Sequence, residues 1–142
     1  MDKDIIDKVR VSYGKCLQDP HFIDKFYDRF LASSPEIKPR FSNTDYAKQK
    51  QILGHAINML VMFPKGNRIA VNVLERVRET HSSSQLNIRP ELYQLWKRCL
   101  METVRECDPT AATEILLAWD AILQLGIDFI VRGYKKKYQS AY

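Results

Sequence analysis

The sequence lacks long apolar runs and a recognisable leader. No stretch of its 142 residues approaches the roughly 18 consecutive apolar residues that cross a membrane. Residues 1–4, MDKD, do not have the cationic and then apolar regions of a secretory signal peptide. The three cysteines, Cys16, Cys99 and Cys107, cannot all pair within one chain and have no Cys-x-x-Cys spacing, so neither a disulfide framework nor a cysteine zinc site is expected. These absences predict a cytoplasmic protein that does not associate with membranes.

Glycine is also scarce. The chain has five glycines and no Asn-Gly or Asp-Gly pair, the dipeptides that favour β-hairpin turns. Apolar residues recur at spacings of three and four and do not alternate, which predicts an all-α protein. The length fits a single domain, residues 1–142, without repeats or linkers. We expect helices at about 4–17, 22–32, 69–80, 90–106 and 109–134, a helical turn within 34–41, and a long helix that is capped by Asn43 or Thr44 and runs through Phe63.

Positive charge is in moderate excess over negative charge. The formal net charge is +5, and much of the excess lies in Arg132 and the lysine run at 135–137. Lysines in a last helical turn interact favourably with the helix dipole and keep a small protein soluble. No nucleic-acid-binding module motif accompanies them, so nucleic acid is not an expected partner.

His81 is the most informative residue because of its position. It closes the amphipathic helix at 69–80, and a polar loop at 82–87 follows it. The next segment, Ile88-Arg89-Pro90-Glu91-Leu92-Tyr93, begins another helix, with proline at a first-turn position. A second informative stretch is residues 26–41, FYDRFLASSPEIKPRF, which links the second helix to the following corner.

These two segments resemble bacterial single-domain globins and the haem domain of flavohaemoglobins. The resemblance continues through the 44–63 helix and through Ala118-Trp119, and it covers nearly the whole chain. It implies a three-over-three helical globin fold that binds one haem b. The chain has no Cys-x-x-Cys-His motif, which excludes covalent c-type attachment.

The resemblance also implies a role for each pocket residue. His81 matches the proximal iron ligand, and its other ring N–H needs an acceptor, expected to be a carbonyl near Val77 or a hydroxyl such as Ser82. Phe41 matches the phenylalanine that packs on the haem face, and Ile88 matches a residue at the haem edge. The full expected set of haem-contacting residues is Phe41, Tyr46, Leu53, Val77, His81, Ile88 and Tyr93.

On the ligand-binding, distal side, Tyr27 matches the position whose phenol points at a bound gas. Gln49 is the best match to the distal residue that is usually His or Gln, with Lys48 or Gln51 as alternatives because the register is open by a residue or two. Leu53 lies four residues after Gln49, on the same helix face, where the resemblance places an aliphatic residue over the iron.

A tyrosine and an amide on the distal side imply tight binding of oxygen. Bound dioxygen acquires negative charge, which two hydrogen-bond donors stabilise, whereas carbon monoxide gains much less. The expected function is reversible binding of O2, NO and CO, with nitric oxide dioxygenation as a possible activity. The reductase domains of flavohaemoglobins are missing, so turnover would need a separate electron donor, and the protein is expected to be a monomer or homodimer.

Two features separate the chain from the flavohaemoglobin pattern. In that pattern a tyrosine and a glutamate support the proximal histidine; Tyr93 could be the tyrosine, but the glutamate position matches Tyr134. The alternatives are a gas-sensing module that signals to a partner, which the absence of an output domain disfavours, and a structural globin relative without haem. His21 and His55 are expected to be solvent-facing or packing residues.

Overall fold

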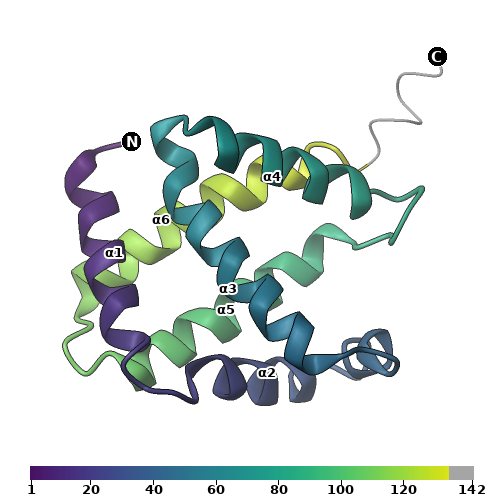
Figure 1. Ribbon diagram of the computed structural model, residues 1–142, viewed down its shortest axis with the longest axis horizontal. Coiled ribbons are helices and arrows are strands. Elements are labelled where there is room, and N and C mark those ends of the chain that lie inside the picture. Colours follow the sequence, from purple (N-terminus) through teal and green to yellow (C-terminus); the bar gives the residue numbers. More distant parts are fainter. Residues whose placement is uncertain (135–142) are drawn as a thin grey trace.

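The protein folds into helices joined by short loops. In the computed structural model, which describes residues 1–134, the chain contains six α-helices, two short 3-10 helices and no strand (Figure 1). The elements are α1 (Lys3–Cys16), α2 (Phe22–Ala32), η1 (Lys38–Phe41), α3 (Tyr46–Met62), η2 (Phe63–Lys65), α4 (Arg68–Thr80), α5 (Pro90–Cys107) and α6 (Thr113–Val131). The predicted all-α class is therefore confirmed. No helix in this part of the chain has the length and hydropathy needed to span a membrane.

Polar side chains cap several helix N-termini. The Asp2 carboxylate accepts a hydrogen bond from the Asp4 N–H at 3.0 Å, and the Asn67 side chain accepts one from the Ala70 N–H at 3.1 Å. Such bonds satisfy main-chain donors that have no partner within the helix.

The cap of α3 differs from the prediction. Asp45 caps this helix, and its carboxylate accepts the Lys48 N–H at 3.3 Å. Thr44, one of the two predicted caps, lies in the preceding turn because its N–H donates to the Phe41 carbonyl at 3.1 Å. The predicted cap at Asn43 or Thr44 was therefore wrong by one or two residues.

The ends of α6 also differ from the prediction. The helix begins at Thr113, not at residue 109, because Asp108 organises a turn before it. The Asp108 carboxylate accepts both the main-chain N–H of Thr110 at 2.9 Å and its hydroxyl at 2.7 Å, and the Ala111 N–H donates to the Asp108 carbonyl. At the other end α6 stops at Val131, and the Tyr134 N–H returns to the Val131 carbonyl in a turn.

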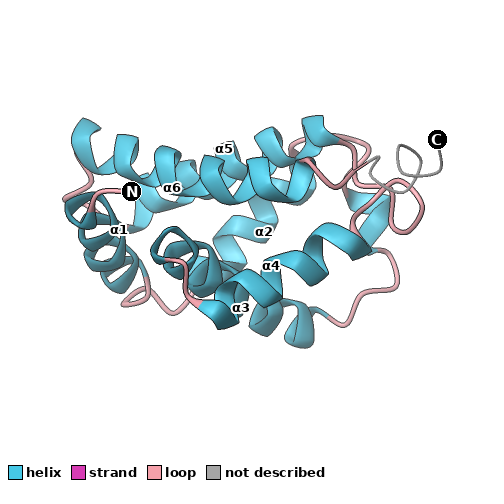
Figure 2. Cartoon of the chain, turned by 90° about the horizontal axis from the view of Figure 1, so that it is seen from above, coloured by secondary structure: helices cyan, strands magenta, loops and turns pink. Residues whose placement is uncertain are grey.

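The helices form two layers around one core. Figure 2 shows α5 and α6 side by side in one layer, with α3 and α4 on the opposite side. A Cβ atom placed on Gly126 of α6 would lie 2.2 Å from Leu60 Cδ2, so the absence of a side chain at this position lets Leu60 of α3 approach α6 closely. This crossing holds the two layers together.

Trp119 lies at the centre of the core, fully buried. Its indole N–H donates to the Ser12 hydroxyl at 2.9 Å, and Ser12 donates to the Asp108 carboxylate at 2.6 Å. The Tyr13 ring meets the indole edge-on at a centroid distance of 6.1 Å. These buried polar contacts join α1, α6 and the end of α5, and each partner is satisfied, as burial of polar groups requires.

Candidate haem site

His81 lies at the C-terminal cap of α4, where its main-chain N–H donates to the Val77 carbonyl at 2.9 Å. Its ring is half-buried, and Nδ1 lies 2.8 Å from the Tyr93 hydroxyl oxygen. The two rings are also stacked, with centroids 6.1 Å apart and planes at 30°. The expectation that Val77 or Ser82 would accept from the ring was wrong: the Val77 carbonyl binds the main chain, and the Ser82 hydroxyl pairs with that of Ser84.

Burial keeps both partners of this pair neutral. It lowers the pKa of His81 and raises the pKa of Tyr93, because the charged forms lose solvation. In the tautomer whose Nδ1–H donates to Tyr93, the other ring nitrogen, Nε2, carries a lone pair. No hydrogen bond within residues 1–134 involves Nε2. A neutral imidazole oriented through Nδ1 is the form in which histidine binds a metal.

Tyr27 and Gln49 form a second polar pair, between α2 and α3. Tyr27 is buried, and its oxygen accepts the Gln49 side-chain N–H at 3.1 Å, while its own hydroxyl lies 3.4 Å from the Gln49 main-chain carbonyl. Burial raises the pKa of Tyr27, so the phenol remains a proton donor. The two alternatives to Gln49, Lys48 and Gln51, are exposed.

Aromatic rings surround Tyr27. Phe41 and Tyr46 both meet it edge-on at centroid distances of 6.1 Å, and Phe41 also contacts Phe30. An open groove of about 570 Å³ between the end of α2, η1 and the start of α3 reaches both Phe41 and Tyr46. The Tyr27 phenol is therefore enclosed by rings that lie beside an open groove.

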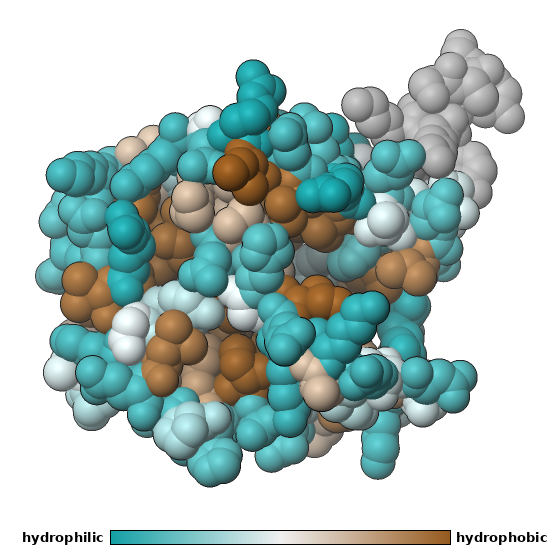
Figure 3. Space-filling view, viewed as in Figure 1, coloured by the Kyte–Doolittle hydropathy of each residue, from teal (hydrophilic) through white to brown (hydrophobic). Residues whose placement is uncertain are grey.

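Apolar residues complete the candidate site. Leu53 is buried one turn after Gln49, and Val77 and Ile88 are partly buried against the core. Figure 3, in the same view as Figure 1, shows apolar side chains between the polar ones on this face of the molecule. His21 and His55 are exposed, as expected for residues outside the site. No cluster of three or more metal-ligating side chains occurs in the described part of the chain.

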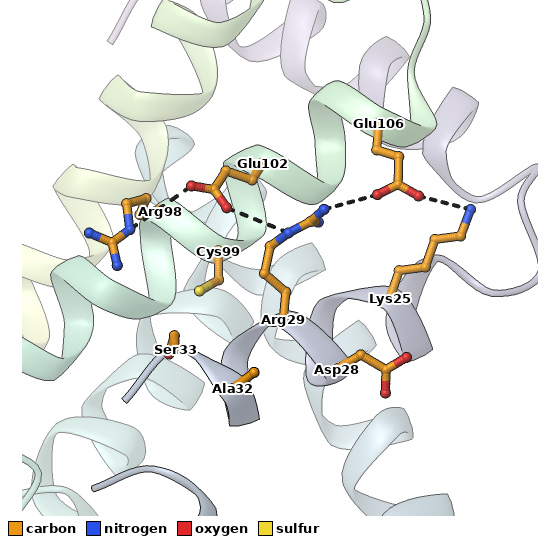
Figure 4. A pocket seen from close by; sticks show the side chains of 9 residues that line it. All are labelled: Lys25, Asp28, Arg29, Ala32, Ser33, Arg98, Cys99, Glu102 and Glu106. Carbon is orange, nitrogen blue, oxygen red and sulfur yellow. Dashed lines mark hydrogen bonds and ion pairs between the residues drawn. The ribbon is translucent and has the colours of Figure 1, made fainter. Parts of the chain in front are cut away.

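A different groove, of about 720 Å³, lies between α2 and α5 (Figure 4). Most of its charged side chains are paired with one another: Arg29 binds Glu106 at 2.9 Å and Glu102 at 3.5 Å, and Lys25 binds Glu106 at 3.2 Å. None of the expected haem-contacting residues lines it. These ion pairs stabilise the contact between the two helices.

Comparison with known proteins places the chain in a family. No family profile matches the sequence. A Pseudomonas aeruginosa protein, whose crystal structure is described as structurally highly homologous to a human hemoglobin, is 39% identical and superposes with a TM-score of 0.87 over 92% of this chain and 98% of that one. The chain belongs to the globin family. The predicted resemblance to bacterial globins and the predicted globin fold are both confirmed.

This globin is also similar to longer curated proteins. Flavohemoproteins of Vibrio cholerae and Halalkalibacterium halodurans are 32% and 29% identical over 105 and 119 residues, which are 72% and 82% of the chain. The matched region is only 26% and 28% of those proteins, so the chain spans about a quarter of their length.

Membership of this family implies a haem cofactor, and the residues present fit it. The donor set is one neutral imidazole whose Nε2 has no hydrogen bond among the described residues, which suits the single protein ligand of a haem iron. Apolar side chains and one partly buried pair of hydrogen-bond donors accompany it.

Sequence reasoning missed one group of residues around this site. Arg40 and Arg89, with Glu36, link the loop that follows His81 to the segment that contains η1. The available signal was their position: Arg40 directly precedes Phe41, and Arg89 directly follows Ile88.

Proposed function

We propose that this globin binds haem b through His81 and reversibly binds diatomic gases, with oxygen as the principal ligand and residues 1–142 acting as one domain. The observation that carries the proposal is the pair of donors formed by the buried Tyr27 phenol and the half-buried Gln49 side chain, 3.1 Å apart. Haem, when bound, would supply the iron at which O2, NO and CO bind. The chain's own residues would hold the iron on one side and donate hydrogen bonds on the other.

On the proximal side, Tyr93 acts as a positioning residue. Its hydroxyl oxygen lies 2.8 Å from His81 Nδ1 and restrains rotation of the ring, and when it accepts the Nδ1 proton the lone pair of Nε2 is left for the iron. The phenol has no carboxylate partner among the described residues. Histidine basicity therefore comes from a neutral hydrogen bond, which favours reversible binding over chemistry that needs a strongly electron-donating ligand.

On the distal side, the geometry favours donation toward a gas. Because the Gln49 N–H donates to the Tyr27 oxygen, the phenol is oriented while its own proton remains available. Its contact with the Gln49 main-chain carbonyl is long, at 3.4 Å, so little is lost when the proton turns to a ligand. A ligand that carries negative charge gains most, since hydrogen bonds to charged groups contribute about 1.5–3 kcal/mol.

Nitric oxide dioxygenation is a second candidate activity. It is favoured by the similarity to proteins named flavohemoproteins, whose name denotes a flavin as well as haem. Repeated turnover would need electrons, and we propose that a separate reductase supplies them, by analogy with the flavin that those proteins carry.

The test is the absorption spectrum of the purified protein in its ferric, reduced and oxygenated forms. We expect a haem spectrum in the wild type and its loss or marked change in His81→Ala. The matched control is His55→Ala, which removes an exposed histidine of α3 and should leave the spectrum unchanged. An identical spectrum in wild type and His81→Ala would show that His81 is not the ligand, and absence of haem from the wild type after reconstitution would reject the proposal.

A further inference from the structure

Two segments that carry proposed haem contacts are joined by a small set of polar bonds. One is the loop at 82–89, which follows His81 and contains Ile88; the other is 34–41, which ends at Phe41. Figure 1 shows both on the right-hand side of the molecule. We call Glu36, Arg40 and Arg89, which link them, the rim clamp.

The rim clamp consists of one ion pair and two hydrogen bonds to the main chain. The Arg89 guanidinium binds the Glu36 carboxylate, and this interaction lowers the pKa of Glu36. Arg40 donates to the carbonyls of Leu86 and Asn87 at 3.4 and 3.5 Å. The three contacts of the clamp join residues that are 46 to 53 positions apart in the sequence. They bind the loop at Leu86, Asn87 and Arg89.

Tyr134, in the turn that follows α6, also holds the loop. The Ser83 N–H donates to the Tyr134 carbonyl at 2.8 Å, and the Tyr134 hydroxyl donates to the Asn87 side chain. The Ile88 N–H donates to the His81 carbonyl at 3.1 Å, and this bond links Ile88 directly to His81. With the clamp released, the hydrogen bonds to Tyr134 and those to the end of α4 would still hold the loop.

We propose that the rim clamp holds this loop closed against the 34–41 segment and thereby sets the rate at which haem leaves the protein. The inference rests on the proposed function, because it takes His81, Phe41 and Ile88 as haem contacts. Release of haem requires the loop and the η1 segment to separate, and the clamp consists of the polar bonds that oppose that separation. These bonds are partly exposed, with Arg89 and Glu36 side chains 46% and 40% accessible, so the clamp is also sensitive to salt.

The experiment measures haem transfer from the ferric holoprotein to excess apomyoglobin. We expect Glu36→Gln, Arg89→Gln and Arg40→Gln each to lose haem about two- to fivefold faster than wild type, which is the range that a partly exposed polar contact supplies. The control is Asp24→Asn, which breaks the ion pair between Asp24 and Lys50 outside the clamp. The Asp24 side chain is 41% accessible, close to the value for Glu36. This variant should leave the rate unchanged.

Charge reversal separates the ion pair from a general loss of structure. Glu36→Arg and Arg89→Glu should each speed haem loss, and the double variant should recover most of the wild-type rate. High salt should speed loss from wild type more than from Glu36→Gln. A double variant as fast as the singles would overturn the assignment of the pair.

A second readout does not need haem. The amides of Leu86, Asn87 and Ile88 donate to the carbonyls of Thr80, Ser82 and His81, and clamp variants of the haem-free protein should increase their hydrogen exchange. If all three Gln variants lose haem and exchange these amide hydrogens at the wild-type rates, the proposed role of the clamp is wrong, although the proposed haem binding would still stand. Failure of the wild type to bind haem would instead reject the function on which the inference rests.

Discussion

Removal of the Tyr27 hydroxyl is the most direct test of how the pocket holds a gas. Tyr27→Phe takes away one oxygen from a side chain that is 4% exposed and keeps the ring that packs against Phe26, Phe41 and Tyr46. A hydrogen bond to a charged partner contributes about 1.5–3 kcal/mol, so oxygen should dissociate roughly 10- to 150-fold faster.

The folding cost of the same change should be small. The Gln49 amide loses the oxygen to which it donates at 3.1 Å, but Gln49 is half-exposed and water can replace that partner. We expect a loss of about 1 kcal/mol or less in the free energy of unfolding. A large effect on oxygen with a small effect on stability would therefore report on ligand binding itself.

The assay is stopped-flow measurement of oxygen dissociation, with carbon monoxide dissociation measured in parallel. Carbon monoxide carries little negative charge, so its rate should change far less. The matched control is Tyr46→Phe, which removes the hydroxyl of a neighbouring phenol. This hydroxyl forms no hydrogen bond with the residues that the structure describes. Oxygen dissociation within twofold of wild type in Tyr27→Phe, or equal acceleration for both gases, would refute the reasoning.

Three further predictions concern stability. Asp108→Asn should lower the free energy of unfolding by about 1–3 kcal/mol in urea titrations, because it removes the charge that accepts from Ser12 at 2.6 Å. Burial raises the pKa of Asp108, but its hydrogen bonds outweigh this effect, so the pKa is lowered overall in the folded protein. The difference in unfolding free energy between wild type and Asp108→Asn should therefore be complete above pH 4 and decrease as the pH falls below it. A difference that does not change with pH would contradict this. Gly126→Val should cost about 1–3 kcal/mol because its Cβ would meet Leu60, and an unchanged melting temperature would show that the two helices separate freely. Asn67→Ala should cost about 1 kcal/mol in thermal unfolding through loss of the α4 cap, and an effect below the error of the measurement would mean that water replaces the cap.

Most of the fold follows from local sequence signals. The second helix was predicted with the observed bounds, Phe22–Ala32, because apolar residues on one face and Pro20 before it define the helix. The errors fall where a side chain bonds to a main chain a few residues away. Asp45 caps α3 in place of the predicted residues, and the turn that the Asp108 carboxylate stabilises makes α6 begin later than predicted. The spacing of apolar residues does not indicate which of several neighbouring polar residues forms such a bond.

The candidate site was harder to predict where partners are distant in sequence. The resemblance matched Gln49 to the distal position, with its four-residue spacing from Leu53 in support, and the structure puts its side chain on Tyr27, 22 residues earlier. The resemblance had offered Tyr93 as the tyrosine that supports His81, and its hydroxyl lies 2.8 Å from the ring, whereas Val77 and Ser82, the expected acceptors close in sequence, bond elsewhere. Contacts of this kind depend on how helices pack, which composition and periodicity do not contain.

The two tryptophans divide the molecule into separately observable halves. Trp119 is fully buried, with its N–H bound to Ser12 of α1, so its fluorescence should be emitted at short wavelength and shift to the red only when α1 leaves the core. Trp96 is half-buried and meets the Phe26 ring edge-on at 6.0 Å, so its emission reports on the contact between α2 and α5. The fluorescence of two single-tryptophan variants during unfolding would thus show whether the contact of α1 with the core and the contact between α2 and α5 are lost together or one after the other.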